Sequence, residues 1–272
     1  MNCKKLLVTS MILTSCILCA PHSFAAQPIK AQVSKSYVDI SRLIEYNNYD
    51  TADQRIKEIL NKNPNDLDAK ALQLISQAKQ YKLAPAQSEL DKLLKKYPNK
   101  PELHYAQGLV YLMRQTSSDV EYIKNITNLS NAAIKEFVTA VGLDSTYYQA
   151  YNAMGVATLK LGNKKDAQDL FKVALKINPQ FAPAYDNLGN IAMLDGDLDQ
   201  AEKYYLQSIK CNSHNPTSMY HMGQVESRRG DYTKALTWIN HSLHINPNSS
   251  PAWNLQGELY LKQGNQPAAI NS

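Results

Sequence analysis

The chain has 272 residues, of which 44% are hydrophobic and 19% are charged, and its formal net charge is +5 at pH 7. This composition is typical of a soluble globular protein. It contains no long acidic or basic block, and its lysine pairs, such as Lys95-Lys96 and Lys164-Lys165, are scattered. Because nucleic-acid binding requires a concentrated basic surface, we expect no nucleic acid among the partners.

Residues 1–26 are predicted to be a secretory signal. Lys4 and Lys5 precede an apolar run from Leu6 to Ala20, and Ser23-Phe24-Ala25 offers a small-residue cleavage site. The run of fifteen residues is shorter than a membrane span. Removing this segment takes away two lysines, so the net charge of the mature chain falls from +5 to +3.

A second interpretation of the same segment is a lipoprotein signal. Leu13-Thr14-Ser15-Cys16 resembles a bacterial lipobox, in which Cys16 would be lipidated. We favour cleavage near Ala25, because the apolar run continues beyond Cys16, whereas lipoproteins usually turn polar there. Either signal predicts export to the periplasm or outer envelope of a bacterium. Contact with the membrane is expected only through the signal or the lipid anchor.

Cysteine usage predicts a mature chain without an internal disulfide. Cys3, Cys16 and Cys19 lie in the signal, which leaves Cys211 alone. We interpret Cys211 as a packing residue near the end of a helix rather than as a nucleophile.

From residue 33 the chain follows a period of 34 residues. The units are numbered so that a recurring glycine falls at position 8. This glycine is Gly108, Gly155, Gly189, Gly223 and Gly257. Apolar or small residues at positions 4, 7, 8 and 11 form one face of a first helix, helix A, and those at positions 20, 24 and 27 form the matching face of a second, helix B. Each unit is therefore predicted to be a helical hairpin.

The connection between the two helices also carries a signal. Position 15 is glycine in the last four units, at Gly162, Gly196, Gly230 and Gly264. Glycine suits the left-handed residue that ends a helix, and the Asn or Asp that follows suits the cap of the next one. Asp197 and Gln200 have the spacing of a capping box.

The units differ in regularity along the chain. Residues 33–100 form two degenerate units, with Ile40 and Leu74 at the glycine position. The unit at 101–147 carries an insertion of thirteen residues, roughly 115–128, which we expect to add a helical turn or two and a loop. Residues 148–249 form three regular units. Residues 250–272 form an incomplete unit, and we expect the sequence to be truncated there, because a repeat array needs a capping element.

This pattern resembles the tetratricopeptide repeat family. The residues that carry the resemblance are the aromatics Tyr151, Tyr185 and Trp253, the pair Leu188-Gly189, the alanines Ala167, Ala201 and Ala235, the aromatics Phe171 and Tyr205, and the prolines Pro179 and Pro247. The resemblance implies an all-α fold, a right-handed superhelical solenoid of about seven antiparallel helix pairs with the last one incomplete. It also implies a non-enzymatic scaffold that binds a protein or peptide.

In this family, positions 2, 5, 6, 9, 12 and 13 of helix A line a concave groove. In the last four units these positions are largely polar, and the predicted peptide-binding residues are Gln149, Asn152, Asp186, Asn187, Asn190, Tyr220, His221, Gln224, Arg228, Asn254, Glu258 and Lys262. Asn and Gln amides both donate and accept hydrogen bonds, so a row of them can hold an extended peptide backbone without demanding its sequence. The carboxylate clamp of the family, Lys at position 5 with Asn at position 9, is absent.

In the first three units the corresponding positions are largely apolar. They are Tyr37, Ile44, Ala71, Ile75, Tyr105, Leu109, Leu112 and Met113. Two interpretations remain open at this point. These residues could receive hydrophobic side chains or an amphipathic helix of a ligand. They could equally pack between neighbouring units.

No catalytic, cofactor or metal motif is evident. His241 and His244 lie three residues apart on a predicted helix B, but no further ligands converge on them. The leading hypothesis is therefore an exported scaffold, similar to the repeat proteins of envelope, pilus or secretion assembly. The alternatives are a self-associating structural array and the repeat arm of an enzyme whose domain lies beyond Ser272. Neither the ligand nor the oligomeric state follows from the sequence.

Overall fold

The computed structural model describes residues 35–114 and 119–270, and these residues form helices and their connections without a strand. The helices are α2 (Lys35–Glu45), α3 (Tyr49–Lys62), α4 (Leu67–Lys79), α5 (Leu83–Lys96), α6 (Pro101–Met113), α7 (Asp119–Leu143), α8 (Tyr148–Lys160), α9 (Lys164–Ile177), α10 (Ala182–Asp195), α11 (Leu198–Cys211), α12 (Pro216–Arg229), α13 (Tyr232–Ile245), α14 (Ser250–Lys262) and α15 (Gln266–Ile270). The predicted all-α solenoid is confirmed.

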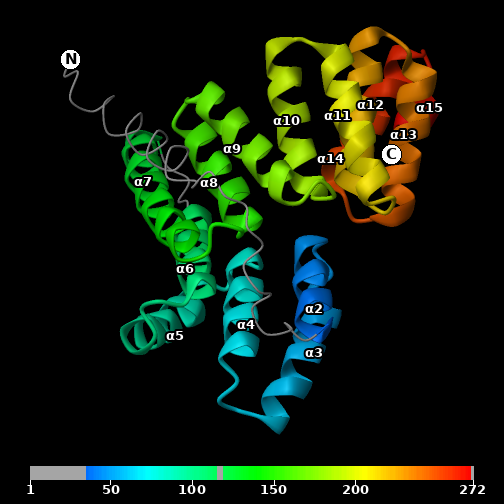
Figure 1. Cartoon of the computed structure of the whole chain (residues 1–272). Helices are drawn as coiled ribbons and strands as arrows, with labels where there is room; N and C mark the ends of the chain where they lie inside the picture. The colour runs from blue at the N-terminus through cyan, green and yellow to red at the C-terminus, as the bar shows by residue number, and fades with distance from the viewer. Residues whose placement is uncertain (1–34, 115–118, 271–272) are drawn as a thin grey trace, which may run out of the picture.

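The helices pair in sequence, as Figure 1 shows from α2 to α15. The even-numbered helices are the A helices of successive units, and the odd-numbered helices are the B helices. Each helix A packs on its own helix B, as α10 does on α11, and helix B also packs on the next helix A, as α11 does on α12. Repeats of this kind bury their apolar surface one interface at a time rather than around one central core.

Glycine at position 8 allows helices A and B of a unit to approach closely. A Cβ atom built on Gly155 would lie 2.6 Å from a ring carbon of Phe171, and one on Gly189 would lie 2.5 Å from a ring carbon of Tyr205. Both rings belong to position 24 of helix B and are fully buried. The missing side chain therefore makes room for a large ring at the centre of these two hairpins.

Glycine at position 15 ends helix A in the left-handed conformation. The φ angles of Gly162, Gly196, Gly230 and Gly264 lie between 75° and 84°, which confirms the prediction for this position. In the two degenerate units the same position is held by Asn47 and Tyr81, both with φ of 59°. The left-handed turn therefore survives where the glycine is lost, at a steric cost of roughly 1 kcal/mol or more for a residue with a side chain.

Polar caps follow this turn in some units. The Asp197 carboxylate accepts a hydrogen bond of 3.0 Å from the backbone N–H of Gln200, and Asp231 accepts one of 3.0 Å from Lys234. The expected cap at Asn163 is not formed, because its side chain makes no hydrogen bond to the start of α9. The corresponding residue of the last unit, Asn265, does accept from the N–H of Ala268, at 3.2 Å.

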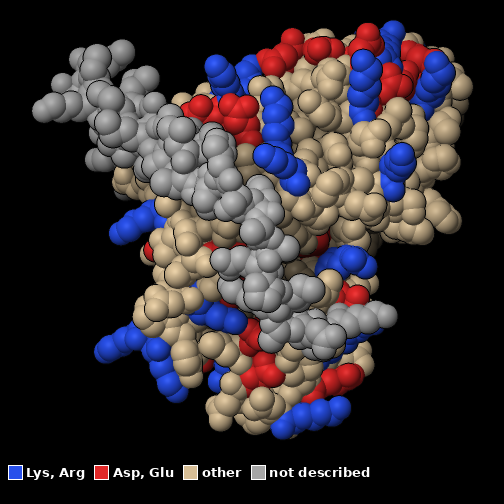
Figure 2. Space-filling view, in the orientation of Figure 1, with Lys and Arg blue, Asp and Glu red and all other residues tan. Residues whose placement is uncertain are grey.

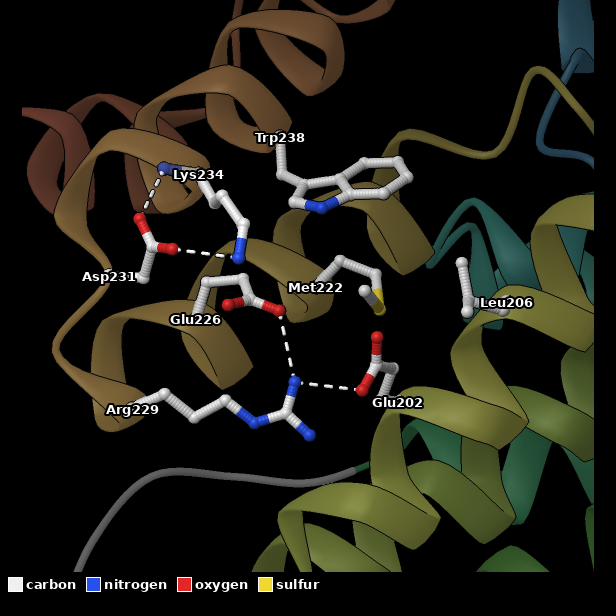
Figure 3. A pocket seen from close by; sticks show the side chains of 8 residues that line it. All are labelled: Glu202, Leu206, Met222, Glu226, Arg229, Asp231, Lys234 and Trp238. Carbon is white, nitrogen blue, oxygen red and sulfur yellow. Dashed lines mark hydrogen bonds and ion pairs between the residues drawn. The ribbon is translucent and has the colours of Figure 1, made fainter.

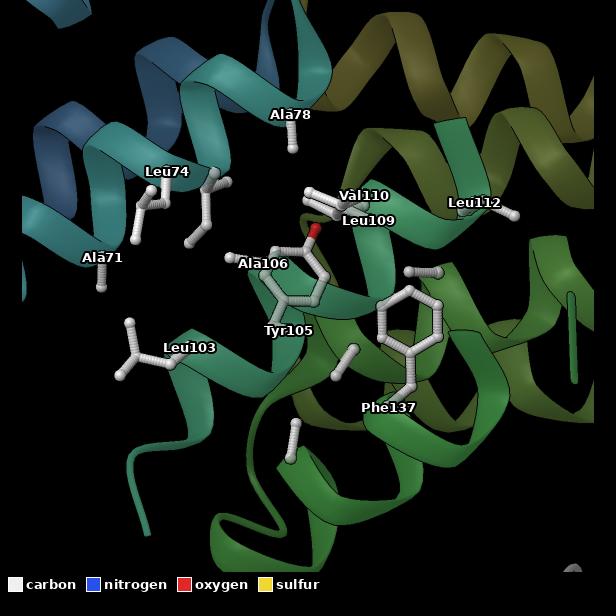
Figure 4. Close-up of a cluster of buried hydrophobic side chains, with 14 of the residues drawn as sticks. Ala71, Leu74, Ala78, Leu103, Tyr105, Ala106, Leu109, Val110, Leu112 and Phe137 are labelled. Atoms are coloured by element: carbon white, nitrogen blue, oxygen red, sulfur yellow. The ribbon is translucent and has the colours of Figure 1, made fainter. Parts of the chain in front are cut away.

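The first half of the chain shares one continuous apolar cluster. Figure 4 shows part of it, with Leu74 of α4, Tyr105 and Val110 of α6 and Phe137 of α7 directed toward one another. Ile40 and Leu74, which replace glycine at position 8, are buried. Position 24 of the same units is Ile56 and Leu90, so aliphatic side chains replace the ring and leave room for the larger residue at position 8.

The third unit has the longest helix of the described residues. α7 spans 25 residues from Asp119 to Leu143, whereas the other B helices before α15 have 14. Much of the predicted insertion thus adds turns to the start of this helix, and residues 115–118 lie outside the described residues. Among the described residues, no helix combines the length and hydrophobicity that a membrane span requires. The predicted signal at 1–26, including Cys16, also lies outside them.

The close approach at position 8 gives a direct test of packing. Substituting Gly189→Val should lower the free energy of unfolding by about 2 kcal/mol or more, because the new side chain overlaps the buried Tyr205 ring. The matched control is Gly142→Val on α7, where a Cβ meets nothing within 4 Å. Urea denaturation followed by circular dichroism measures both variants. Equal stability of the two would contradict the packing described here.

Candidate functional site

Two predicted groove residues, Asn152 of α8 and Asn187 of α10, meet across neighbouring units. The Nδ2 atom of Asn187 donates a hydrogen bond of 2.9 Å to Oδ1 of Asn152, and both side chains are partly buried. This bond uses one donor of Asn187 and one acceptor site of Asn152. An amide group offers two donors and a carbonyl acceptor, so the Asn187 carbonyl and the Asn152 amino group retain hydrogen-bonding capacity.

Tyr205 connects the next two predicted residues. Its hydroxyl donates to Oδ1 of Asn190 at 2.8 Å, and its ring stacks on the imidazole of His221 with centroids 5.1 Å apart and an angle of 18°. Burial and the nearby Asp186 raise the pKa of Tyr205 well above its ordinary value, so the hydroxyl remains a donor. From the sequence, Tyr205 is predicted only as a packing residue at position 24 of helix B. Its polar contact could have been expected, because a buried tyrosine hydroxyl usually requires a polar partner.

Three predicted residues of α12 form a second group. The Nε2 atom of Gln224 donates to the hydroxyl oxygen of Tyr220 at 3.0 Å, and Nδ1 of His221 lies 3.0 Å from Oε1 of Gln224. Burial, with a smaller contribution from Glu258 of α14, raises the pKa of Tyr220. His221 thus links the α12 group to Tyr205 and Asn190.

Two further predicted residues are engaged in holding adjacent units together. The Asp186 carboxylate accepts hydrogen bonds from the Ser218 hydroxyl at 2.6 Å and from Nδ2 of Asn215 at 2.9 Å. Burial raises its pKa although these bonds oppose the shift. Arg228 donates to the backbone carbonyl of Met193 at 3.0 Å, near the end of α10.

The predicted residues of α14 lie on a more open surface. Asn254, Glu258 and Lys262 are exposed. The Lys262 ammonium stands 5.4 Å from the ring centroid of Tyr232, a cation–π distance. The structure therefore brings together the predicted residues of α8, α10 and α12 and leaves those of α14 beside them in solvent.

Gln149 takes part in a contact between the first and fourth units. Oε1 of Glu45, at the end of α2, accepts from Nε2 of Gln149 at 2.9 Å and from the Tyr148 hydroxyl at 3.3 Å. Burial raises the pKa of Glu45. Burial also lowers the pKa of Lys79, although the negative charge of Glu45 acts in the opposite direction. Glu45 and Lys79 both stand at position 13 of their helix A, so the repeat register could have identified them as inward-facing residues.

The apolar residues of the first three units are mostly buried within the protein. Ile44 is 2% exposed, Leu109 3% and Tyr105 6%. Ala71, Ile75 and Leu112 are likewise buried, whereas Tyr37 and Met113 are partly buried. Of the two interpretations left open by the sequence, packing between units accounts for most of these positions.

The described residues contain no group of three or more His, Cys, Asp or Glu side chains arranged to hold a metal ion. His241 contacts the ring of Trp238 edge-on, with centroids 6.1 Å apart. Cys211 is a free, partly buried thiol, and burial raises its pKa. A raised pKa lowers the thiolate fraction and hence the reactivity of a cysteine. The Cys16 prediction concerns a residue outside the described ranges.

The contact of Glu45 predicts a pH dependence of stability. The folded chain holds the Glu45 proton more tightly than the unfolded chain does, because burial raises the folded pKa above 4.5. The tighter binding of this proton stabilises the folded chain at pH values below the pKa of Glu45 in the unfolded chain. This contribution is lost as the pH rises through the pKa of Glu45 in the folded chain. Glu45→Gln removes this titration, so its stability relative to the natural chain should increase between about pH 4 and pH 7.

Urea denaturation at several pH values measures this difference. Glu58→Gln on α3 is the control, because Glu58 is an exposed carboxyl on the same pair of helices. A difference between Glu45→Gln and the natural chain that stays constant with pH, or falls as pH rises, would contradict the buried placement of Glu45.

Comparison with known proteins is consistent with this geometry. Models of the tetratricopeptide repeat match residues 148–181, 182–215 and 238–271. None of the curated proteins compared shows significant sequence similarity to the chain. All of these matches lie in the second half of the chain, from Tyr148 onward.

Solved structures share the fold across most of the chain. A chain of the APC/C hetero-tetramer Cut9-Hcn1 superposes with a TM-score of 0.72 and 18% identity, covering 87% of this chain. The present chain spans 44% of the length of that protein. The structure described as pilF of Pseudomonas aeruginosa superposes with a TM-score of 0.60 and 17% identity, covering 75% of this chain and 87% of pilF. From the repeat matches and the shared fold we conclude that the chain belongs to the tetratricopeptide repeat family, whose members act as protein-interaction scaffolds.

Proposed function

We propose that the chain binds an extended peptide segment of a partner protein on the A helices of its regular units. The amide row, defined as Asn152, Asn187, Asn190 and Gln224, supplies the contacts. The observation that carries the proposal is the hydrogen bond between Asn187 and Asn152, because it aligns two amides from adjacent units and leaves each with an unused group.

The chemistry of the amide row fits a peptide backbone. An extended peptide presents an N–H donor and a C=O acceptor at each residue. The Asn152 amino group can donate to such a carbonyl, and the Asn187 carbonyl can accept from such an N–H. Backbone contacts of this kind give affinity with little sequence preference, and neighbouring side chains then select the partner.

The orientation of the amide row is fixed before a ligand arrives. Tyr205 holds the oxygen of Asn190, and His221 and Tyr220 hold the two ends of the Gln224 amide. Side chains that are already ordered lose little conformational entropy on binding. The intramolecular bonds therefore favour recognition as well as stability.

The proposal places this scaffold in a bacterial cell envelope. Its support is the sequence of residues 1–26, with two lysines, an apolar run and a small-residue cleavage site. The mature protein is then soluble in the periplasm, or anchored by a lipid on Cys16 if the lipobox is used.

Peptide selection tests the binding proposal. Random peptides displayed on phage are selected against residues 27–272, and the affinity of a recovered peptide is measured by fluorescence polarisation. Asn187→Ala should weaken binding by about tenfold, the effect of losing one or two hydrogen bonds. The matched control is Gln207→Ala, an exposed amide on α11, which should bind as the natural chain does.

Circular dichroism and thermal unfolding establish that both variants are folded. The proposal fails if folded Asn187→Ala and Gln224→Ala bind the selected peptide as tightly as the natural chain, or if Gln207→Ala weakens binding to the same extent.

Intact-mass and N-terminal analysis of the protein expressed in a bacterium tests export. We expect a mature chain that begins near Ala26 or Gln27. A diacyl or triacyl mass on Cys16 would establish the lipoprotein alternative instead. A protein that retains residues 1–26 would contradict export by either route.

A further inference from the structure

A pocket of about 410 Å³ opens between α11, α12 and α13 (Figure 3), and no residue of the amide row lines it. Its lining is Glu202, Leu206, Met222, Glu226, Arg229, Asp231, Lys234 and Trp238. None of these residues belongs to the predicted groove. Its size lies at the lower end of the range of ligand pockets, about 300–1,000 Å³, and suits one or two side chains rather than a whole helix.

One wall of the pocket is apolar. Leu206 of α11 is 41% exposed, Trp238 of α13 is partly buried, and Met222 of α12 is 1% exposed. Figure 3 shows the Trp238 ring on the side of the pocket opposite Arg229, with Met222 between the two. An exposed leucine beside a tryptophan offers a surface for the methylene groups of another side chain.

The opposite side of the pocket carries an excess of carboxylates. The Arg229 guanidinium contacts Glu202 at 2.7 Å, Glu226 at 3.1 Å and Asp199 at 2.6 Å. These hydrogen bonds, chiefly the one to Glu202, raise the pKa of Arg229, so it stays charged. A single guanidinium therefore faces three carboxylates, and the local charge is negative.

The second cation of the pocket does not balance this charge. The Lys234 ammonium lies 2.9 Å from the carboxylate of Asp231, the residue that precedes α13. Glu226 is only 5% exposed, so its charge is shielded from solvent. Charges in such a partly enclosed site interact more strongly with an added cation than charges in open water do.

We propose that this pocket binds a lysine or arginine side chain of a partner protein, flanked by an apolar residue. The methylene stem lies against Leu206 and the Trp238 ring, and the cationic head approaches Glu202 and Glu226. Attraction between the cation and the indole face adds to the ion pair. This surface differs from the amide row, so it gives the scaffold a second contact.

Corresponding places in the array lack this combination. A pocket of about 400 Å³ between α3, α4 and α5 has Asp53 at the position of Glu202 and Gln77 at that of Glu226, with no aromatic residue in its lining. Asp53 is also already bonded to Ser76 at 2.6 Å. At the next boundary Gln87 and Gln107 bond to each other. The combination of apolar and anionic side chains beside α11, α12 and α13 is thus absent from these two described boundaries.

The two tryptophans of the chain provide the test. The probe is the peptide acetyl-Leu-Lys-Leu-amide, titrated into the ¹⁵N-labelled mature chain while the indole N–H signals are followed by NMR. Trp238 lines the pocket, whereas the Trp253 indole N–H donates to the carbonyl of Pro247 at 2.7 Å and serves as an internal reference. The Trp238 signal should shift saturably, and the Trp253 signal should not.

Matched peptides and variants define the interaction. Replacing the lysine of the probe by norleucine, or Glu202 of the protein by Gln, should weaken binding by about fivefold, since each removes one partner of an ion pair. The control Asp169→Asn removes a carboxylate on α9 that does not line the pocket, and should leave binding unchanged. Asn187→Ala should also bind the probe as the natural chain does, which separates this proposal from the amide row.

Several outcomes would overturn the proposal. They are no shift of Trp238, equal shifts of both indoles, equal binding of the norleucine peptide, and an effect of Glu202→Gln no larger than that of Asp169→Asn. Leu206→Ser supplies a second variant at an exposed position, and unchanged affinity there would remove the apolar wall from the site.

Discussion

The close approach of helices A and B at position 8 is the constraint on which the regular units depend. Gly155 and Gly189 leave the space that Phe171 and Tyr205 fill, so these two hairpins close around a buried ring, and Gly223 faces the buried Ile239 in the same way. Hairpins of similar shape then stack with a regular spacing, and residues at equal or adjacent positions of neighbouring units fall side by side. The contact between Asn152 and Asn187, which are 35 residues apart, follows from this regularity.

Polar side chains inside the array serve two different purposes. Asp186 and Arg228 hold neighbouring units together, because their hydrogen bonds reach Ser218 and the Met193 carbonyl. Asn152 and Asn187 are oriented by the array but keep unused donors and acceptors. A buried carboxylate such as that of Asp186 requires these partners, since an unpaired buried charge is strongly destabilising. In the proposed function, stability and recognition thus depend on different residues of the same helix.

Much of the fold could be predicted from the period of 34 residues. Glycine at positions 8 and 15 specifies a close helix pair and a left-handed turn, both local properties that each unit repeats. The bonding of individual side chains could not be predicted in the same way. Asp186 and Asn152 both stand at position 5, so the sequence predicts that they face the same side of the array. That Ser218 and Asn215 donate hydrogen bonds to the Asp186 carboxylate depends on the residues of the next unit.

Contacts over longer distances depend on the whole superhelix. Glu45 meets Gln149 because small rotations accumulate over four units, and no residue pattern encodes that sum. The pocket beside Trp238 depends on a shorter range, because its lining comes from three consecutive helices in two units. The sequence therefore predicts which way a side chain faces better than it predicts what that side chain contacts.

Hydrogen–deuterium exchange with a bound, selected peptide tests the central claim most directly, because it locates the binding surface without altering any residue. The account predicts slower exchange in α8, α10 and α12 than in the free chain, with smaller changes in α9, α11 and α13. Slower exchange confined to the B helices would contradict the assignment of peptide binding to the A helices.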